Sequence, residues 1–266
     1  MNGLLRKNPD APYSIIFCAG FYPGRKEGLA TFIKMLPENI NILFFDARGH
    51  GKSEGRFFTN IYNYGIDEYK DIIGAIQFLQ SETSNKPLFI HGICAGAFHA
   101  THALSRIDTT HYHIKGFIFD SGLESLLNAC TVPEKHFREK VIPNLLQKIY
   151  TNDSKKEIKE RYICKLLSSL TCVALRAVTT LVKPYLEKRE HAMTLGNHLN
   201  KIVCPILFIH SYDDTYCPIQ CIKDLTEKAS TKMSWWLNQS EHALNHIKHK
   251  DEYQKQLNIF IANTIV

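Results

Sequence analysis

The sequence predicts an α/β protein built on a mostly parallel, doubly wound sheet, and two observations carry this prediction. Short apolar runs rich in β-branched and aromatic residues recur along the chain without polar alternation, as in strands that are buried on both faces. Between these runs lie longer segments whose apolar residues recur at helical spacing. Such an alternation of strand and helix is typical of a parallel sheet covered by helices.

The individual elements follow from these two patterns. Strands are predicted over 14–18, 42–45, 88–91, 116–119, 206–210 and, as a weaker run, 232–237. Helices are predicted over 66–79, 97–104 and 253–261. Any antiparallel strand ahead of the first buried strand is expected to be absent or vestigial, because that strand begins so early in the chain.

The alternation stops after Asp120 and resumes near Cys204. The residues between them contain no strand pattern and predict helices over about 133–149, 155–182 and 184–199. We therefore expect an α/β core made of 1–121 and 201–266, interrupted by a helical cap over 122–200. An apolar stripe at helical spacing runs through this cap: Ile163, Leu166, Leu167, Leu170, Val173, Ala174, Ala177 and Leu181.

Composition excludes several classes of protein. The chain has 266 residues, of which 44% are hydrophobic and 22% charged, which is ordinary for a globular protein. Its net charge of +6 comes from Lys and Arg interleaved with acidic residues, which favours a solvated surface over a nucleic-acid site. The N-terminus lacks the apolar core of a signal peptide, and no run of about 20 apolar residues could span a membrane. The eight cysteines are expected to be reduced thiols in a cytoplasmic protein.

A reactive turn is predicted after the strand at 88–91. There the sequence reads Gly92-Ile93-Cys94-Ala95-Gly96, directly before the helical pattern at 97–104. This is the Gly-x-nucleophile-x-Gly turn, with Cys in the place where Ser usually stands. Small residues two positions away on each side let strand and helix pass closely, and the helix N-terminus helps to stabilise a thiolate. Alternatively, Cys94 is merely a small buried residue.

With this turn, the sequence resembles the α/β-hydrolase superfamily over nearly its whole length. Residues 45–55, Phe-Asp-Ala-Arg-Gly-His-Gly-Lys-Ser-Glu-Gly, match the D-x-R-G-x-G-x-S stretch of the branch that contains serine aminopeptidases and monoacylglycerol lipases. The cysteine in the turn also resembles that of dienelactone hydrolases and some acyl thioesterases. The resemblance implies a mainly structural role for Asp46, Arg48 and His50.

The resemblance also implies that the catalytic acid follows the nucleophile in the chain. Residues 210–218 are similar to the family turn H-G-x-x-D-x-x-V-P, which aligns Asp214 with the acid. Asp213 is an alternative, although a turn residue in this place often hydrogen-bonds its own backbone. Asp120 is a second alternative, because some relatives carry the acid after the strand that follows the nucleophile.

The catalytic base is expected near the end of the chain, where the family carries its histidine. The stretch 240–246 reads Ser-Glu-His-Ala-Leu-Asn-His and follows the strand predicted at 232–237. His242 is therefore the expected base, with His246 and His249 as alternatives. His50, in the loop after the strand at 42–45, is a more distant one.

An oxyanion hole requires two backbone N–H groups that point at the developing charge. Ala95, the residue after the nucleophile, is expected to supply one of them. Family members usually have His-Gly after the first buried strand, and Ala19-Gly20 aligns with this pair. The resemblance thus implies Phe21 as the second donor, although the usual His is missing.

These residues predict a hydrolase that cleaves a small-molecule ester or thioester through an acyl-cysteine intermediate, with a Cys94–His242–Asp214 triad. An acyltransferase that uses the same cysteine and a non-catalytic binding protein on the hydrolase fold are alternatives. No metal or organic cofactor and no nucleic-acid partner is expected. The cap stands where relatives carry a lid over the acyl pocket. Its apolar stripe would either pack against the core or line an acyl groove, and its Lys and Arg would form either a solvated face or a contact with a membrane surface. Acyl length and oligomeric state stay open.

Overall fold

The computed structural model describes residues 1–20, 26–55, 67–125 and 194–265, together with single residues at 177, 180, 181 and 184. The chain divides into two compact units, of which one joins Met1–Glu124 to Thr194–Val266 and the other is Ser125–Met193. Most of the expected cap, including nearly all of its apolar stripe, lies outside the described residues.

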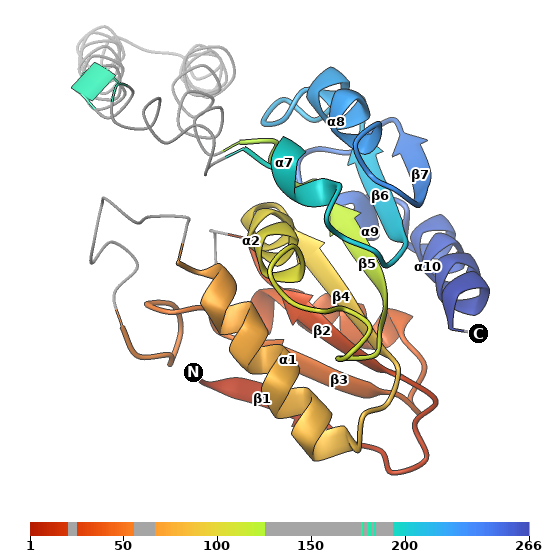
Figure 1. Ribbon diagram of the computed structural model, residues 1–266. Coiled ribbons are helices and arrows are strands. Elements are labelled where there is room, and N and C mark those ends of the chain that lie inside the picture. The colour runs from red at the N-terminus through yellow and green to blue at the C-terminus, as the bar shows by residue number, and fades with distance from the viewer. Residues whose placement is uncertain are drawn as a thin grey trace, which may run out of the picture. The chain divides into compact units, whose positions relative to one another are not determined.

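Seven strands form one sheet in the order β1-β3-β2-β4-β5-β6-β7 (Figure 1). Strands β2 to β7 are parallel, and β1 pairs antiparallel with β3, so the predicted mostly parallel sheet is confirmed. The strands are β1 (Gly3–Arg6), β2 (Ser14–Cys18), β3 (Asn41–Phe45), β4 (Leu88–Ile93), β5 (Ile114–Asp120), β6 (Ile206–Ser211) and β7 (Lys232–Leu237). All six expected strands are present, and β1 is a four-residue antiparallel addition at the edge.

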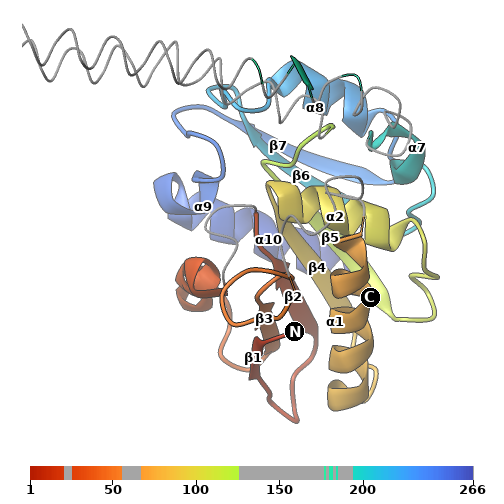
Figure 2. The same ribbon diagram turned by 90° about the vertical axis from the view of Figure 1, so that its left-hand side faces the viewer.

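Helices cover both faces of this sheet, as a doubly wound architecture requires. Figure 2 shows α1 and α2 on one side of the strands and η1 and α10 on the other. The helices are η1 (Lys26–Met35, a 3-10 helix), α1 (Tyr69–Thr83), α2 (Ala95–Leu104), α7 (Gly196–Leu199), α8 (Ile219–Thr226), α9 (Asn245–Lys248) and α10 (Lys250–Thr264). The sequence predicted α1, α2 and α10 but not η1, α8 and α9, which are 3-10 or short.

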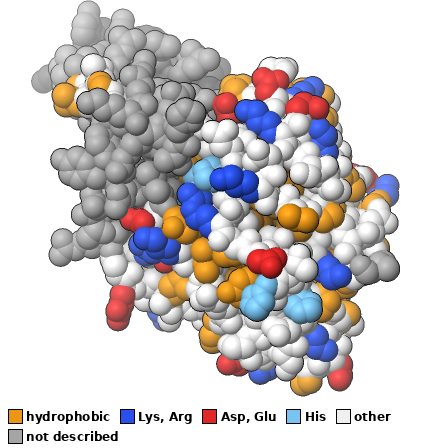
Figure 3. All heavy atoms as spheres, in the orientation of Figure 1, with side chains coloured by type: hydrophobic (Ala, Val, Ile, Leu, Met, Phe, Trp, Pro, Cys, Tyr) orange, Lys and Arg blue, Asp and Glu red, His pale blue; other side chains and the backbone are white. Residues whose placement is uncertain are grey.

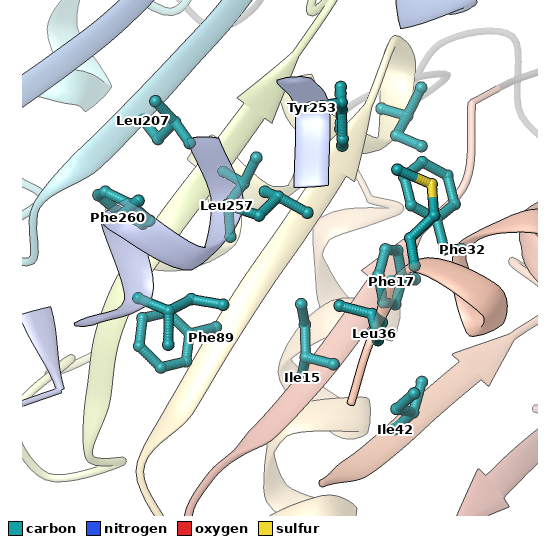
Figure 4. Close-up of a cluster of buried hydrophobic side chains, with 14 of the residues drawn as sticks. Ile15, Phe17, Phe32, Leu36, Ile42, Phe89, Leu207, Tyr253, Leu257 and Phe260 are labelled. Atoms are coloured by element: carbon teal, nitrogen blue, oxygen red, sulfur yellow. The ribbon is translucent and has the colours of Figure 1, made fainter. Parts of the chain in front are cut away.

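A buried apolar cluster fixes η1 and α10 against the sheet (Figure 4). Phe32 of η1 and Phe17 of β2 are fully buried, and their ring centroids lie 4.9 Å apart. Leu257 and Phe260 of α10 are buried in the same cluster, together with Phe89 of β4. Every residue of β2, β3 and β4 is buried, which explains why these strands are continuous apolar runs in the sequence. The packed sheet gives the loops at its carboxyl end a rigid base.

The loop after β3 is tied down by two buried carboxylates. Asp46 is fully buried and accepts hydrogen bonds from the backbone N and the Nζ of Lys26, at 2.8 and 2.6 Å, and from the backbone N of Lys52 at 3.0 Å. The Arg48 guanidinium makes a two-pronged contact with Asp71 of α1, at 2.9 and 2.7 Å. These contacts connect the loop to η1 and α1, on the two faces of the sheet.

The surface of the first unit carries both signs of charge. On the face in Figure 3, basic and acidic side chains are interspersed among polar and hydrophobic ones. Of the helices in the described part of the chain, none has the length and apolar character needed to cross a membrane. The five described cysteines, Cys18, Cys94, Cys204, Cys217 and Cys221, are free thiols.

Candidate active site

Cys94 occupies a strained turn between β4 and α2. Its φ of 55° and ψ of −122° lie in a region that residues with a side chain rarely adopt. Its backbone N donates to the carbonyl of Asp120 on β5 at 2.9 Å, and its own carbonyl accepts from Ala97 at 3.1 Å. A side chain at Gly92 would clash with the backbone of Ala97, and one at Gly96 with the carbonyl of Cys18. Both glycines are therefore required for the sharp turn that presents Cys94.

The loop after β2 runs directly beside the Cys94 side chain. A Cβ added to Gly20 would lie 3.0 Å from the Cβ of Cys94 and 3.4 Å from its Sγ. Ala95 is fully buried and is the first residue of α2, so its N–H has no acceptor within the helix. Phe21, the other expected oxyanion donor, lies outside the described residues. The structure thus places the loop of the expected hole, with Gly20, against the nucleophile candidate.

Asp214 lies in the turn after β6 and is almost fully buried. Its Oδ1 accepts hydrogen bonds from the backbone N of Tyr216 at 2.9 Å and of Cys217 at 3.0 Å. Its Oδ2 accepts from the Nδ1 of His242 at 2.8 Å and lies 3.4 Å from the Nε2 of His210. Burial alone would raise the pKa of Asp214, but these contacts outweigh it and hold the pKa below its usual value. The carboxylate is therefore ionised and fixed in place.

His242 follows β7 and receives its orientation from Asp214 through Nδ1. Its Nε2 is buried and makes no hydrogen bond with the described residues. Burial would lower the pKa of His242, but the bond to Asp214 and the proximity of Cys94 raise it to about 10. The imidazole consequently carries a positive charge near neutral pH, between a carboxylate and a sulfur atom.

The alternative acids make other contacts. Asp213 is exposed, and its Oδ2 accepts the backbone N of Gln239 at 2.6 Å, which ties the turn after β6 to the turn after β7. Asp120 is fully buried at the end of β5, between the strands that carry Cys94 and Asp214. Only Asp214 among the three hydrogen-bonds His242 in the described part of the chain.

The alternative bases also make other contacts. The ring of His246 stacks on Phe32 with centroids 4.2 Å apart, and burial lowers its pKa to about 4. The Nε2 of His249 and the Nδ1 of His50 each lie within hydrogen-bonding distance of a backbone carbonyl, at 2.8 and 3.1 Å. The geometry therefore separates His242 from the other expected candidates.

A buried polar network beside the site was not predicted from the sequence. Asp120 accepts hydrogen bonds from Ser121 at 2.9 Å, from Asn245 at 2.7 Å and from Tyr253 at 2.7 Å. Tyr253 also contacts His91 at 2.9 Å. Burial raises the pKa of Asp120 despite these bonds. Asn245 comes three residues after His242, so the network anchors the histidine loop to the end of β5.

Within the described ranges, no group of three or more His, Cys, Asp or Glu side chains is arranged to hold a metal ion. The chemistry available to this constellation is that of a thiol, an imidazolium and a carboxylate in sequence, which is a nucleophile–base–acid arrangement.

Comparisons with known proteins identify the family of the chain. The family model described as serine aminopeptidase S33 (Hydrolase_4) matches residues 16–246, from the first buried strand to the histidine loop. The chain belongs to the serine aminopeptidase S33 family of α/β-hydrolases. The predicted superfamily and branch are thereby confirmed. Members of this family are named for a serine enzyme, whereas the turn here presents a cysteine.

Individual relatives are distant. The uncharacterized protein YqkD of Bacillus subtilis (strain 168) is 25% identical over 261 residues, which cover 96% of this chain and 72% of YqkD. The Pyrococcus furiosus esterase Pf2001 superposes with a TM-score of 0.67 at 18% identity, covering 97% of this chain and 85% of the esterase. The Exiguobacterium antarcticum esterase EaEST gives 0.63 at 16% identity, covering 98% and 94%. These similarities confirm the α/β-hydrolase fold.

Proposed function

We propose that this α/β-hydrolase cleaves carboxylic esters or thioesters through an acyl-cysteine intermediate on Cys94. One observation carries the proposal: a cysteine at φ 55° interacts with a histidine whose Nδ1 is held by a buried aspartate at 2.8 Å. The name esterase, which Pf2001 and EaEST carry, supports an ester as the bond to be broken.

In the first half of the reaction, the Cys94 thiolate attacks the acyl carbon and the carbonyl oxygen becomes an oxyanion. The N–H of Ala95, at the start of α2, supplies one hydrogen bond to this charge, and the loop that begins at Gly20 supplies the second. The tetrahedral species then collapses. The imidazolium of His242 gives the proton on its Nε2 to the leaving alcohol or thiol, and an acyl-Cys94 thioester remains.

In the second half, the neutral imidazole takes a proton from water as the water attacks the thioester. The C–S bond breaks, the carboxylic acid is released, and Cys94 leaves as a thiolate beside the newly formed imidazolium. Asp214 keeps its charge throughout and orients the ring, so that the same Nε2 serves as acid and then as base.

The decisive experiment traps the intermediate. The full chain is mixed with p-nitrophenyl acyl esters and with acyl thioesters, turnover is measured, and the quenched protein is analysed by peptide mass spectrometry. We expect the acyl mass on the peptide that contains Cys94, and we expect its loss in Cys94→Ala. The control is Cys221→Ser, which removes a partly exposed thiol elsewhere in the molecule and is expected to turn over normally.

Two results would contradict the proposal. Turnover that survives in Cys94→Ala would show that another group is the nucleophile. Neither turnover nor labelling with any ester or thioester would favour a binding protein on the hydrolase fold. Adding an amine or alcohol acceptor to the same assay separates an acyltransferase, which forms acylated acceptor, from a hydrolase, which forms only the acid.

We also propose that the segment 122–200 acts as a cap that selects acyl groups. It leaves the core after β5, at the carboxyl end of the sheet, which is where α/β proteins bind ligands. Replacing Leu166, Leu167 or Leu170 with Ala is expected to change the discrimination between long and short acyl chains, measured as the ratio of their kcat/KM values. This change should correspond to about 1–3 kcal/mol at most. If all chain lengths lose the same factor in folded variants, the cap does not select substrates.

A further inference from the structure

Tyr216 makes two contacts with the acid–base pair of the site, one through its backbone and one through its side chain. It lies in the loop between β6 and α8, two residues after Asp214. Its backbone N donates to Asp214 Oδ1 at 2.9 Å. Its ring packs against the ring of His242, with centroids 5.1 Å apart and an angle of 32° between the planes. No other described aromatic ring makes such a contact with His242.

The hydrogen bond from His242 to Asp214 does not fix the orientation of the imidazole plane. It sets the direction of Nδ1, but a single hydrogen bond does not fix the plane of a ring that can still pivot about it. The position of Nε2 relative to Cys94 depends on that plane. The ring of Tyr216 lies against the face of the imidazole and restricts this rotation. Because the face of an aromatic ring attracts a cation, the same contact favours the imidazolium over the neutral ring.

We propose that Tyr216 is a positioning residue whose ring holds His242 in the plane that directs Nε2 toward Cys94 and stabilises its protonated form. This inference rests on the proposed function, because it assigns Tyr216 a part in the same acyl-transfer chemistry. It does not require Tyr216 to touch the substrate. The hydroxyl group is not needed for the effect, since the contact is made by the ring face.

The test compares Tyr216→Leu, which removes the aromatic face, with Tyr216→Phe, which keeps it. Both variants retain the backbone N–H that binds Asp214. The matched control is Tyr212→Leu, because Tyr212 lies in the same turn but is 47% exposed and accepts a hydrogen bond from Lys223 at 3.2 Å. Each protein is assayed for kcat and KM from pH 5 to 10, and the titration of His242 is followed by NMR.

We expect Tyr216→Leu to lower kcat about tenfold with little change in KM, as a cation–ring contact of this size would predict. The imidazolium is needed to protonate the leaving group, so activity falls when pH rises through the pKa of His242. Losing the ring lowers that pKa, and the alkaline limit of the pH profile should therefore move to lower pH. Tyr216→Phe and Tyr212→Leu should keep the wild-type profile.

The NMR titration separates this inference from the proposed function, because it needs no turnover. A lower pKa of His242 in Tyr216→Leu supports the positioning role even if no substrate has been found. An unchanged pKa together with an unchanged alkaline limit would overturn it, whatever the loss of kcat. A loss in Tyr216→Phe as large as in Tyr216→Leu would also overturn it, because the hydroxyl would then be the essential group.

Discussion

Buried histidines at two places in this protein differ in charge: His242 is protonated near neutral pH, whereas His102 and His198 are neutral. His242 has a side chain that is only 14% exposed, yet its pKa is raised to about 10. His102 and His198, where α2 meets α7, are also buried, and their pKa values are lowered to about 2 and about 4. Burial lowers the pKa in all three places. At His242 a carboxylate and a sulfur atom outweigh it, whereas at His102 and His198 the charged neighbours lower the pKa further.

The geometry around His102 and His198 shows why both rings stay neutral. The rings of His102 and His198 have centroids 4.2 Å apart, so a proton on one disfavours a proton on the other. The Nη1 of Arg106 lies 3.1 Å from the Nδ1 of His102 and donates to its carbonyl at 2.7 Å. Arginine cannot give up its proton, so His102 must offer a lone pair at Nδ1. This pair packs the core, whereas His242 is held ready for proton transfer.

The largest expected effect comes from removing the sulfur atom of Cys94, next to His242. Cys94→Ala should abolish turnover, because no nucleophile remains, and should lower the pKa of His242, because one of its two favourable neighbours is gone. Cys94→Ser should leave a low residual rate, since a hydroxyl is far less acidic than a thiol. Brief treatment of wild type with iodoacetamide should modify Cys94 first. Earlier modification of another cysteine without loss of activity would contradict this assignment.

The next largest effect comes from removing the negative charge of Asp214. Asp214→Asn should lower kcat/KM about 10²–10³-fold, which is less than in serine enzymes because a thiol needs less help to ionise. Asp213→Asn is the matched control, since it changes an exposed carboxylate that does not bind His242. Asp120→Asn, which changes a buried carboxylate of the neighbouring network, should also cost less than Asp214→Asn. Equal and small effects in all three variants would mean that no single aspartate orients the histidine.

Most of the sheet could be predicted because it depends on local patterns. Every strand that is buried on both faces appears in the sequence as an uninterrupted apolar run, and the parallel order follows from the helices between them. Strand β1 gave no such signal, because its residues are exposed or half-buried at the edge. The helix η1 is wound as a 3-10 helix, so its side chains do not follow the spacing of an α-helix.

Short motifs in the sequence indicated single candidate residues of the site, but they did not indicate the contacts between distant segments. Cys94 and Asp214 lie in turns that short stretches of sequence mark: two glycines flank Cys94, and the backbone N–H groups of Tyr216 and Cys217 bind Asp214. The contact between Tyr216 and His242 and the network around Asp120 each join segments that are far apart in the chain. No spacing in the sequence encodes these contacts, because they depend on how the strands are ordered in the sheet.

The neutral histidines predict a loss of stability in acid. In the unfolded chain their pKa is about 6.5, so protonation there begins at a pH where the folded state still resists it. Their contribution to the free energy of unfolding is complete above pH 6.5 and declines as pH falls toward the folded pKa values of about 4 and about 2. His102→Leu should remove about 2 kcal/mol of the loss between pH 7 and pH 5, at about 1.4 kcal/mol per pH unit.

Urea unfolding at the two pH values measures this difference, and His111→Leu is the control because His111 is exposed. Both variants remove one histidine from the unfolded chain. Only His102→Leu also removes a histidine that burial keeps neutral in the folded protein, so it should change the pH dependence of the free energy of unfolding. If His102→Leu loses as much stability between pH 7 and pH 5 as wild type does, His102 does not resist protonation in the folded protein.

The smallest expected effect tests whether the charge of Arg106 adds to burial in keeping His102 and His198 neutral. Arg106→Gln keeps a donor near the carbonyl of His102 but removes the positive charge beside both histidines. Because that charge lowers both pKa values, its loss should let His198 accept a proton at higher pH in the folded state.

The Arg106→Gln variant should be less stable at pH 7, since contacts are lost, including the stacking of Arg106 on Tyr69 at 4.5 Å. The loss between pH 7 and pH 4, however, should be smaller than in wild type by a few tenths of a kcal/mol. NMR titration of His198 gives the same answer without unfolding, and an unchanged titration would mean that Arg106 does not contribute to the low pKa of His198.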